Sequence, residues 1–256
     1  MRTHSIGQQI IELTSVPSTN KYAADQLALS KLPHGAVILA HEQTDGRGQR
    51  GRSWLATPGL DLAISVILLP QRLRATDQFA LVRISALAVR ETVAAVLAEA
   101  HAPRRNEVHV KWPNDVLIDR QKVAGILVKN EVVGGLITSV ILGIGMNVNG
   151  TIPALDISAT SLLRETGDVV DRQALLERLC LAVERRWDRW EAEAVDGKEE
   201  YRDHLWGRGR WMDMELDGAP VSGRPLDVDE DGRLLVEWPD GQVGAYGLER
   251  LRFAPR

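Results

Sequence analysis

The chain contains 256 residues, of which 44% are hydrophobic and 26% charged, so it can bury a sizeable core as one large domain or as a main domain with a small appendage. Its formal net charge of −4 excludes an overall electrostatic attraction to nucleic acid or to an anionic membrane. Cys180 is the only cysteine, which excludes an intrachain disulfide and a metal site built from several cysteines.

The N-terminal residues predict a strand followed by a helix. Apolar residues indicate a strand over Gln8–Leu13, and Val16-Pro17 indicates a turn. Ser18 or Thr19 can then cap a helix that ends near Leu29, because a hydroxyl at this position accepts a hydrogen bond from an amide of the first helical turn.

The next segments predict two buried strands and a long helix. Ala36–Ala40 and Leu62–Leu69 are short apolar runs typical of buried strands, and the segment between them is rich in glycine and arginine and predicts a loop. Apolar spacing over Ala75–Glu99 predicts a helix that Pro103 terminates.

Short strands then follow one another too closely for helices to connect them. We expect them at Val108–Lys111, Val116–Ile118, Val123–Val128 and Thr138–Met146, the last after a turn at Gly134-Gly135. This spacing predicts antiparallel hairpins and not β-α-β units. A further helix is predicted over Asp171–Trp190, with an inner face of Ala174, Leu175, Leu179, Ala182, Val183 and Trp187.

The C-terminal tail, Arg210–Phe253, has a different character. Its apolar runs are separated by Asp217-Gly218, Asp231-Gly232 and Asp240-Gly241, and Asp-Gly favours tight hairpins because both residues tolerate a positive φ. We therefore expect a small β-barrel of about five strands. The predicted fold class is α+β: a mixed sheet with packed helices in a domain of residues 1–205, followed by the barrel in residues 206–256.

The predicted loop His41–Trp54 contains Arg47, Arg50 and Arg52 among three glycines. Its glycine spacing superficially matches a dinucleotide-binding fingerprint, but no helix follows to receive a pyrophosphate. Glycine lets the backbone approach a ligand closely, and guanidinium groups bind phosphate or carboxylate. The loop is interpreted as a mobile clamp for an anion, with a solvated basic turn as the alternative.

Three other segments are each weak signals. Lys111–Asp115 reads KWPND, and its lysine and aspartate alone indicate no more than a surface pair. Lys122–Leu127 reads KVAGIL, and Gly143–Asn149 follows a buried strand. Glycines there indicate either a β-bulge or close packing, or else room for a nucleotide.

Together and in this order, these segments resemble the biotin protein ligase family, the biotin–[acetyl-CoA-carboxylase] ligases. Ser18-Thr19-Asn20 is similar to its STN motif and Gly46–Arg52 to its GRGRxGR biotin loop, with KWPND at 111–115, KxAGIL at 122–127 and GxGxN at 143–147. The tail resembles the family's SH3-like C-terminal domain. Regulatory members have an N-terminal helix-turn-helix domain, and because only 17 residues precede Ser18 we expect the catalytic-only type without repressor activity.

The resemblance implies an enzyme that forms biotinyl-5′-AMP from biotin and ATP, with Mg²⁺ accompanying ATP, and transfers biotin to a lysine of a biotin carboxyl carrier protein. The expected catalytic residues are Lys122, Arg47 and Asp115. Lys122 would lie between the biotin carboxylate and the α-phosphate and reduce their repulsion. Asp115 could orient the incoming lysine or a loop arginine, or only cap the turn after Pro113. No residues are expected to form a metal site.

The same resemblance implies the binding residues. Those expected to bind biotin are Ser18, Thr19, Asn20, Gln43, Gly46, Arg47, Gly48, Gln49, Lys122 and Gly125. Those expected to bind ATP or the adenylate are Arg47, Arg50, Arg52, Lys111, Trp112, Asn114 and Asn147. Helix capping alone is the alternative role for Ser18 and Asn20. Gln49 stands where the family usually has arginine, and Arg50 would point to the other side if the loop were extended.

Three other functions compete with this one. A lipoate or octanoate ligase shares the catalytic architecture, but lipoyl ligases have a different glycine-rich pattern in place of the arginine loop. A non-catalytic biotin sensor is the second, but the presence of Lys111, Asp115 and Lys122 argues against it, because a protein that only binds biotin has no need to neutralise phosphate. A nucleic-acid-binding role of the arginine loop is not expected, because the loop has little aromatic interleaving beyond Trp54 and the net charge of −4 gives no support. No membrane partner is expected, because the apolar stretch Val132–Met146 is interrupted by glycines and shorter than the ~20 residues of a membrane helix. The protein is expected to be cytoplasmic, and a homodimer is the assembly considered for it.

Overall fold

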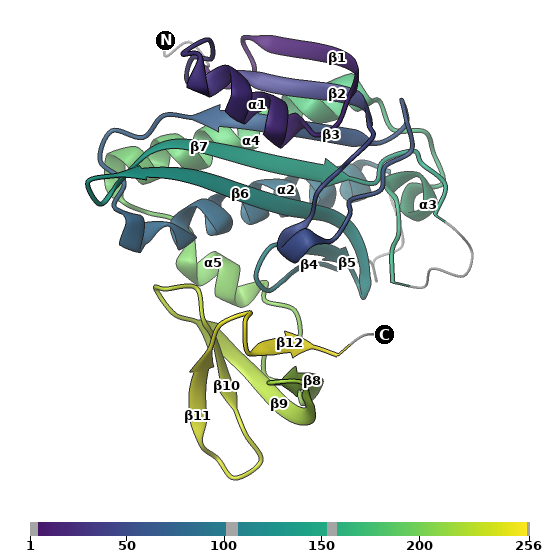
Figure 1. Ribbon diagram of the computed structural model, residues 1–256. Helices are drawn as coiled ribbons and strands as arrows, with labels where there is room; N and C mark the ends of the chain where they lie inside the picture. Colours follow the sequence, from purple (N-terminus) through teal and green to yellow (C-terminus); the bar gives the residue numbers. More distant parts are fainter. Residues whose placement is uncertain (1–4, 101–106, 153–157, 255–256) are drawn as a thin grey trace.

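The computed structural model describes residues 5–100, 107–152 and 158–254, and is built around a seven-stranded mixed sheet (Figure 1). The strand order is β1-β2-β3-β7-β6-β5-β4. The strands are β1 (Ile10–Val16), β2 (Val37–Gln43), β3 (Leu62–Leu68), β4 (Val108–Lys111), β5 (Asp115–Ile118), β6 (Gln121–Val133) and β7 (Leu136–Met146). Only β1 and β2 pair in parallel within this sheet, so the predicted antiparallel hairpins of the β4–β7 region are confirmed.

Helices cover both faces of this sheet. They are α1 (Thr19–Ala28), α2 (Phe79–Glu99), α3 (Leu162–Thr166), α4 (Arg172–Glu193) and α5 (Lys198–Asp203), with single 3₁₀ turns η1 (Gln49–Gly51) and η2 (Ala75–Asp77). Figure 1 shows α1 on one face, and α2 and α4 on the other. No helix of the described ranges is long and apolar enough to cross a membrane.

Alternate residues of the central strands β2 and β3 pack into two different apolar clusters. Ile38 and Ile67 pack with Ala23 of α1 in the smaller cluster, whereas the neighbouring Val37 and Val66 belong to the larger cluster on the face of α2 and α4. Successive side chains of a strand point to opposite faces, so both faces of these central strands must be apolar. This explains why their sequences are continuous apolar runs.

The structure shifts several predicted boundaries. The first strand begins at Ile10 and extends to Val16, and the long helix begins at Phe79 because Ala75–Asp77 forms a separate 3₁₀ turn. The short helices α3 and α5 were not predicted, since five or six residues are too few to show helical periodicity. The predicted role of Pro103 lies outside the described residues.

Ser18 occupies the N-cap position of α1, but its side chain makes no capping hydrogen bond. The Thr19 amide instead donates to the Gln43 side-chain oxygen at 2.8 Å. The predicted hydroxyl cap is therefore wrong, because a glutamine from the end of β2 satisfies this amide.

The C-terminal part forms a second, antiparallel sheet of five strands below the first (Figure 1). Its strands are β8 (Met212–Leu216), β9 (Ala219–Val228), β10 (Leu234–Glu237), β11 (Val243–Tyr246) and β12 (Leu251–Phe253). Asp217 and Gly218 both have positive φ, 52° and 85°, and form the predicted two-residue hairpin turn. The order β11-β10-β9-β8-β12 leaves β11 and β12 as unjoined edges within the described residues, so the sheet is open and not the closed barrel expected.

Candidate active site

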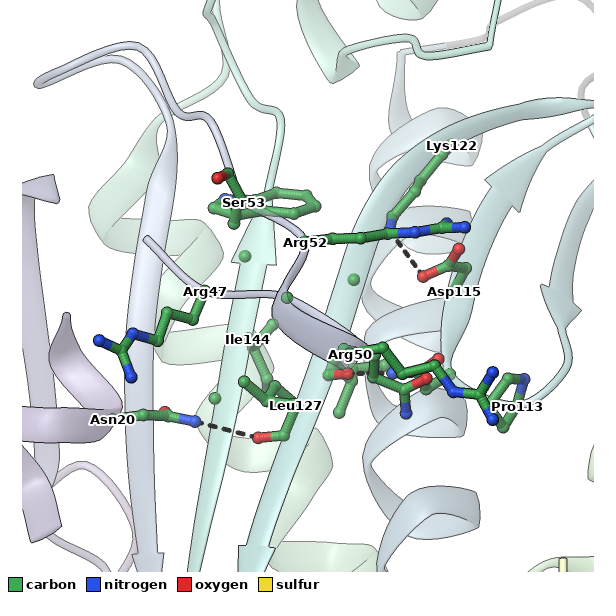
Figure 2. Close-up of a pocket in the computed structure, with 18 of the residues that line it drawn as sticks. Asn20, Arg47, Arg50, Arg52, Ser53, Pro113, Asp115, Lys122, Leu127 and Ile144 are labelled. Carbon is green, nitrogen blue, oxygen red and sulfur yellow. Dashed lines mark hydrogen bonds and ion pairs between the residues drawn. The ribbon is translucent and has the colours of Figure 1, made fainter. Parts of the chain in front are cut away.

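A cavity of about 220 Å³ opens on the α1 face of the large sheet (Figure 2). The start of α1, the arginine-rich loop, the strands β6 and β7, the KWPND segment and strand β12 all contribute to its wall. Segments from both sheets therefore meet at one cavity, although they are far apart in the sequence.

The floor of the cavity is formed by glycines on adjacent strands. Gly125 of β6 is the direct partner of Gly145 of β7, and Gly143 is paired with Leu127. Pairing is regular at these positions, so the predicted alternative of a β-bulge is wrong. A Cβ at Gly143 would overlap the side chain of Asn20, and one at Gly145 would overlap the indole of Trp54. Glycine is therefore required here because two side chains lie directly on the sheet.

Uncharged polar groups gather at the α1 end of the cavity. Ser18, Thr19 and Asn20 are all buried. The Asn20 amide donates to the Leu127 carbonyl at 3.2 Å, and its oxygen accepts from the Ser65 hydroxyl at 2.6 Å. The Thr19 hydroxyl donates to the Gln43 side-chain oxygen at 3.1 Å. These bonds fix a cluster of amides and hydroxyls that suits a neutral, hydrogen-bonding ligand group.

An ion pair lies at the other end of the cavity, on the hairpin of β5 and β6 (Figure 2). The Lys122 ammonium lies 2.7 Å from a carboxylate oxygen of Asp115, and the two side chains are 33% and 28% exposed. The ammonium is also 5.3 Å from the ring centroid of Trp54, on the same side of the floor. A half-buried ammonium with a movable partner can bind an incoming anion.

The arginine-rich loop folds back on itself above the floor. The Trp54 amide donates to the Gly46 carbonyl at 2.8 Å, and the Gly48 amide to the Arg52 carbonyl at 2.6 Å. Its tip is the 3₁₀ turn η1, in which Arg50 has a φ of 54°. The tip is not extended, so the sequence argument that placed Gln49 and Arg50 on opposite sides does not apply. Neither Arg50 nor Arg52 forms an ion pair within the described ranges, whereas the Arg47 guanidinium lies 2.8 Å from Asp45.

The C-terminal sheet supplies a wall that the sequence analysis missed. Leu248, Arg252 and Phe253 line the cavity, and the Arg252 guanidinium lies 2.8 Å from a carboxylate oxygen of Glu215. The Lys111 ammonium lies 5.5 Å from the ring centroid of Phe253, which joins KWPND to this wall. No local sequence signal marks these residues, since they reach the cavity only through packing of the two sheets.

Most of the predicted site residues line the cavity. They are Ser18, Thr19, Asn20, Gln43, Arg47, Gly48, Gln49, Arg50, Arg52, Lys111, Trp112, Asn114, Asp115, Lys122 and Gly125. Gly46 and Asn147 do not line it. Gly46 is buried at the base of the loop, and the Asn147 amide donates to the Thr160 carbonyl at 2.9 Å, behind Lys122. Their placement gives no support to a direct ligand contact.

Other lining residues were not among the individual binding residues predicted from the sequence. Besides the C-terminal wall they are Ser53, Trp54, Ile64, Pro113, Ile126, Leu127, Gly143, Ile144 and Gly145. Trp54 is notable because its indole nitrogen is buried and has no hydrogen-bond partner among the residues that the structure describes. Its position two residues after Arg52 was the only available signal.

The described residues contain no group of three or more His, Cys, Asp or Glu side chains that could hold a metal ion. Asp115 is the single carboxylate among the cavity-lining residues, and it is paired with Lys122. Any divalent cation at this cavity would therefore depend on ligands supplied by a substrate and by water.

Comparison with known proteins identifies the family. Residues 12–147 match the profile of the Biotin/lipoate A/B protein ligase family. The chain is 31% identical over 255 residues to the bifunctional ligase/repressor BirA of Bacillus subtilis, which covers 97% of this chain and 75% of that protein. It is 34% identical over 232 residues to the biotin–[acetyl-CoA-carboxylase] ligase of Mycobacterium tuberculosis, which covers 88% of this chain and 83% of that protein.

A solved structure with the same fold is the biotin protein ligase from Aquifex aeolicus in complex with biotin and ATP. It superposes with a TM-score of 0.75 at 25% identity and covers 96% of this chain and 100% of that chain. The mixed sheet, the antiparallel C-terminal sheet and the matched motifs thus have one explanation: the chain belongs to the Biotin/lipoate A/B protein ligase family.

Proposed function

We propose that the protein is a biotin protein ligase, which activates biotin with ATP and transfers it to a lysine of a carboxylase. The observation that carries this proposal is the division of one cavity into two ends. Buried amides and hydroxyls around Asn20 lie at one end, and Lys122, Arg50 and Arg52 lie at the other (Figure 2). Biotin has an uncharged ureido ring and a carboxylate, so its two ends match the two ends of the cavity.

The activation step brings two anions together. A carboxylate oxygen of biotin attacks the α-phosphorus of ATP, the bond to the β-phosphate oxygen breaks, and pyrophosphate leaves. We propose that Lys122 lies between carboxylate and α-phosphate and stabilises the negative charge of the transition state. Arg47, Arg50 and Arg52 would add positive charge and exclude water from the mixed anhydride as the loop closes.

The transfer of biotin to the acceptor lysine is proposed to take place in the same cavity. The uncharged amine of the acceptor lysine attacks the carbonyl carbon of biotinyl-5′-AMP, an amide forms, AMP leaves, and the amine loses a proton. Asp115 lines the cavity next to Lys122, and we propose that it orients the amine. Ser18, Thr19, Asn20 and Gln43 are proposed to bind the ureido ring. Lys111, Trp112 and Asn114 are proposed to bind the adenylate.

Several finer features belong to this proposal. Mg²⁺ is proposed to enter as a complex with ATP, held mostly by the phosphates and by water. A biotin carboxyl carrier domain is the proposed acceptor. Four further features stay predictions: the SH3-like character of the C-terminal domain, the domain boundary between residues 205 and 206, a homodimer, and a cytoplasmic location.

A lipoate or octanoate ligase is the second candidate, because the matched family covers both chemistries. The test measures exchange of labelled pyrophosphate into ATP with biotin, lipoate or octanoate present in separate reactions. We expect biotin to support exchange and the other two acids to give background rates. Exchange supported only by lipoate or octanoate would contradict the proposal, and biotin binding without any exchange would indicate a sensor.

A further inference from the structure

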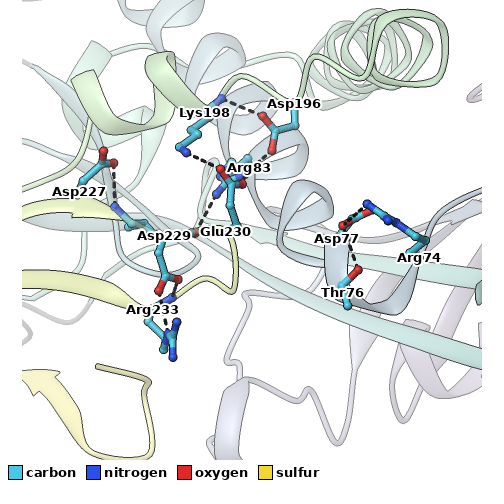
Figure 3. Close-up of polar contacts among 11 residues, drawn as sticks. Arg74, Thr76, Asp77, Arg83, Asp196, Lys198, Asp227, Asp229, Glu230 and Arg233 are labelled. Atoms are coloured by element: carbon cyan, nitrogen blue, oxygen red, sulfur yellow. Dashed lines mark hydrogen bonds and ion pairs between the residues drawn. The ribbon is translucent and has the colours of Figure 1, made fainter. Parts of the chain in front are cut away.

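A buried arginine joins the C-terminal sheet to the catalytic sheet's long helix α2. The Arg83 side chain is only 2% exposed. One end of its guanidinium pairs with Asp196, which precedes α5, and lies 3.5 Å from Glu230. Its other amino group donates to the Asp229 carbonyl at 2.9 Å (Figure 3). Asp229 and Glu230 belong to the loop between β9 and β10, so Arg83 links this loop to α2.

The interactions around Arg83 require a guanidinium group, because two different amino groups of one side chain bind two different partners. A buried charge is strongly unfavourable unless it is paired and hydrogen-bonded. Arg83 satisfies this condition by binding the Asp196 carboxylate and the Asp229 carbonyl at the same time. Lys198 pairs with Glu230 on the outer side of the loop. Two cations from the catalytic part therefore fasten one loop of the C-terminal sheet.

The same loop also contacts the KWPND segment. The Trp112 indole donates to the Gly232 carbonyl at 2.9 Å. Gly232 has a φ of 82°, and a Cβ there would overlap the ring of Phe79. The Arg83 guanidinium carbon lies 4.9 Å above the same ring. The loop backbone is thus bound on both sides of Phe79, by Arg83 at Asp229 and by Trp112 at Gly232.

The strands of the C-terminal sheet connect this loop to the cavity wall. The loop leads into β10, which is joined through β9 and β8 to β12. Arg252 and Phe253 of β12 line the cavity beside Lys111. Because strands joined by hydrogen bonds form contiguous cooperative units, we infer that loosening the loop weakens the contact between this wall and KWPND.

We propose that Arg83 is a positioning residue for the nucleotide end of the cavity. It does not line the cavity, and it acts by fastening the loop Asp229–Gly232 so that Arg252 and Phe253 close over KWPND. This inference rests on the proposed function, which assigns ATP to that end. The hydrogen bonds that hold Asn20 and Gln43 at the biotin end do not involve the loop Asp229–Gly232.

The test compares the full-length protein with its Arg83→Met variant in biotin-dependent pyrophosphate exchange. We expect the KM for ATP to rise roughly ten- to hundredfold, the size of losing hydrogen bonds to a charged group, with the KM for biotin changed less than twofold. Arg83→Lys keeps the charge but not the fork, so its KM for ATP should be intermediate. Glu230→Gln, at an exposed position, should give a smaller rise in the KM for ATP. It replaces Arg83→Met as the test variant if Arg83→Met does not fold.

Arg186→Met is the matched control. Arg186 is also a poorly exposed arginine with two carboxylate partners, Glu91 and Glu200, but it contacts α2 and α5 and not the C-terminal sheet. We expect this variant to lose stability without a selective rise in the KM for ATP. An unchanged KM for ATP in the folded Arg83 variants, an equal rise for biotin, or the same rise in Arg186→Met would overturn the inference. Absence of biotin-dependent exchange in the unaltered protein would instead overturn the proposed function.

Discussion

Replacing Lys122 by alanine removes the ammonium group that lies 2.7 Å from Asp115 inside the cavity. We expect adenylate formation to fall on the order of 10²–10³-fold, as for the loss of one preorganised electrostatic group in other enzymes. The fold should remain, since the side chain is a third exposed and its backbone bonds to Ser158 and Thr160 do not depend on the ammonium.

The magnitude follows from the position of the group. Two unit charges 4 Å apart interact by about 1 kcal/mol in water and about 4 kcal/mol at the effective dielectric constant of a protein surface. The Lys122 and Asp115 side chains are 33% and 28% exposed, and bound biotin and ATP would exclude water from both. The upper part of this range then applies, and about 4 kcal/mol corresponds to nearly 10³ in rate.

The variant also leaves a carboxylate without its cation. In Lys122→Ala the charge of Asp115 adds to the repulsion between biotin and the α-phosphate. The double variant with Asp115→Asn should therefore be less impaired than the product of the two single effects, with a coupling of about 0.5–3 kcal/mol. Effects that simply multiply would show that the charge of Asp115 does not act together with Lys122 in the activation step.

The assay is biotin-dependent exchange of labelled pyrophosphate into ATP, with circular dichroism as the control for folding. Because exchange stops before the acceptor is needed, it isolates the activation step. Near-normal exchange in Lys122→Ala would refute the assigned role of the ammonium group.

Three further outcomes are expected. Gln49→Arg should slow the escape of labelled biotinyl-AMP a few-fold, by about 1 kcal/mol for a stronger hydrogen bond, and equal escape rates would make Gln49 a neutral replacement. Burial lowers the pKa of His109 in the folded protein below its ordinary 6.5. The folded state is therefore fully stabilised by the neutral ring above pH 6.5, and this stability is lost as the pH falls from 6.5 through the lower pKa of the folded state. In His109→Gln the free energy of unfolding, measured by urea denaturation at several pH values, should therefore fall less on acidification than in the unaltered protein. A larger fall in the variant would contradict the lowered pKa. Burial raises the pKa of the Cys180 thiol to about 12, so a disulfide reagent should modify it only on unfolding, and rapid reaction of the native protein would contradict the burial.

The sequence by itself determined the features that are encoded locally. Asp217-Gly218 predicted its hairpin because the turn chemistry of two adjacent residues is sufficient. The apolar runs predicted the central strands, and the spacing of the strands predicted the antiparallel hairpins. The order of the motifs around Asn20, Lys111 and Lys122 predicted the family, since each motif is a short run of consecutive residues.

Other features depended on register and packing between distant segments. The sequence could not show that Gly125 lies opposite Gly145, or that Trp54 covers both, because strand order and register bring them together. It could not place Arg252 at the cavity or Arg83 beneath Asp229, since these contacts join two separate sheets. The physical reason is that periodicity and turn chemistry act over a few residues. Which side chains share a cavity is decided by how the completed elements pack, through the burial of their apolar faces and the pairing of buried charges.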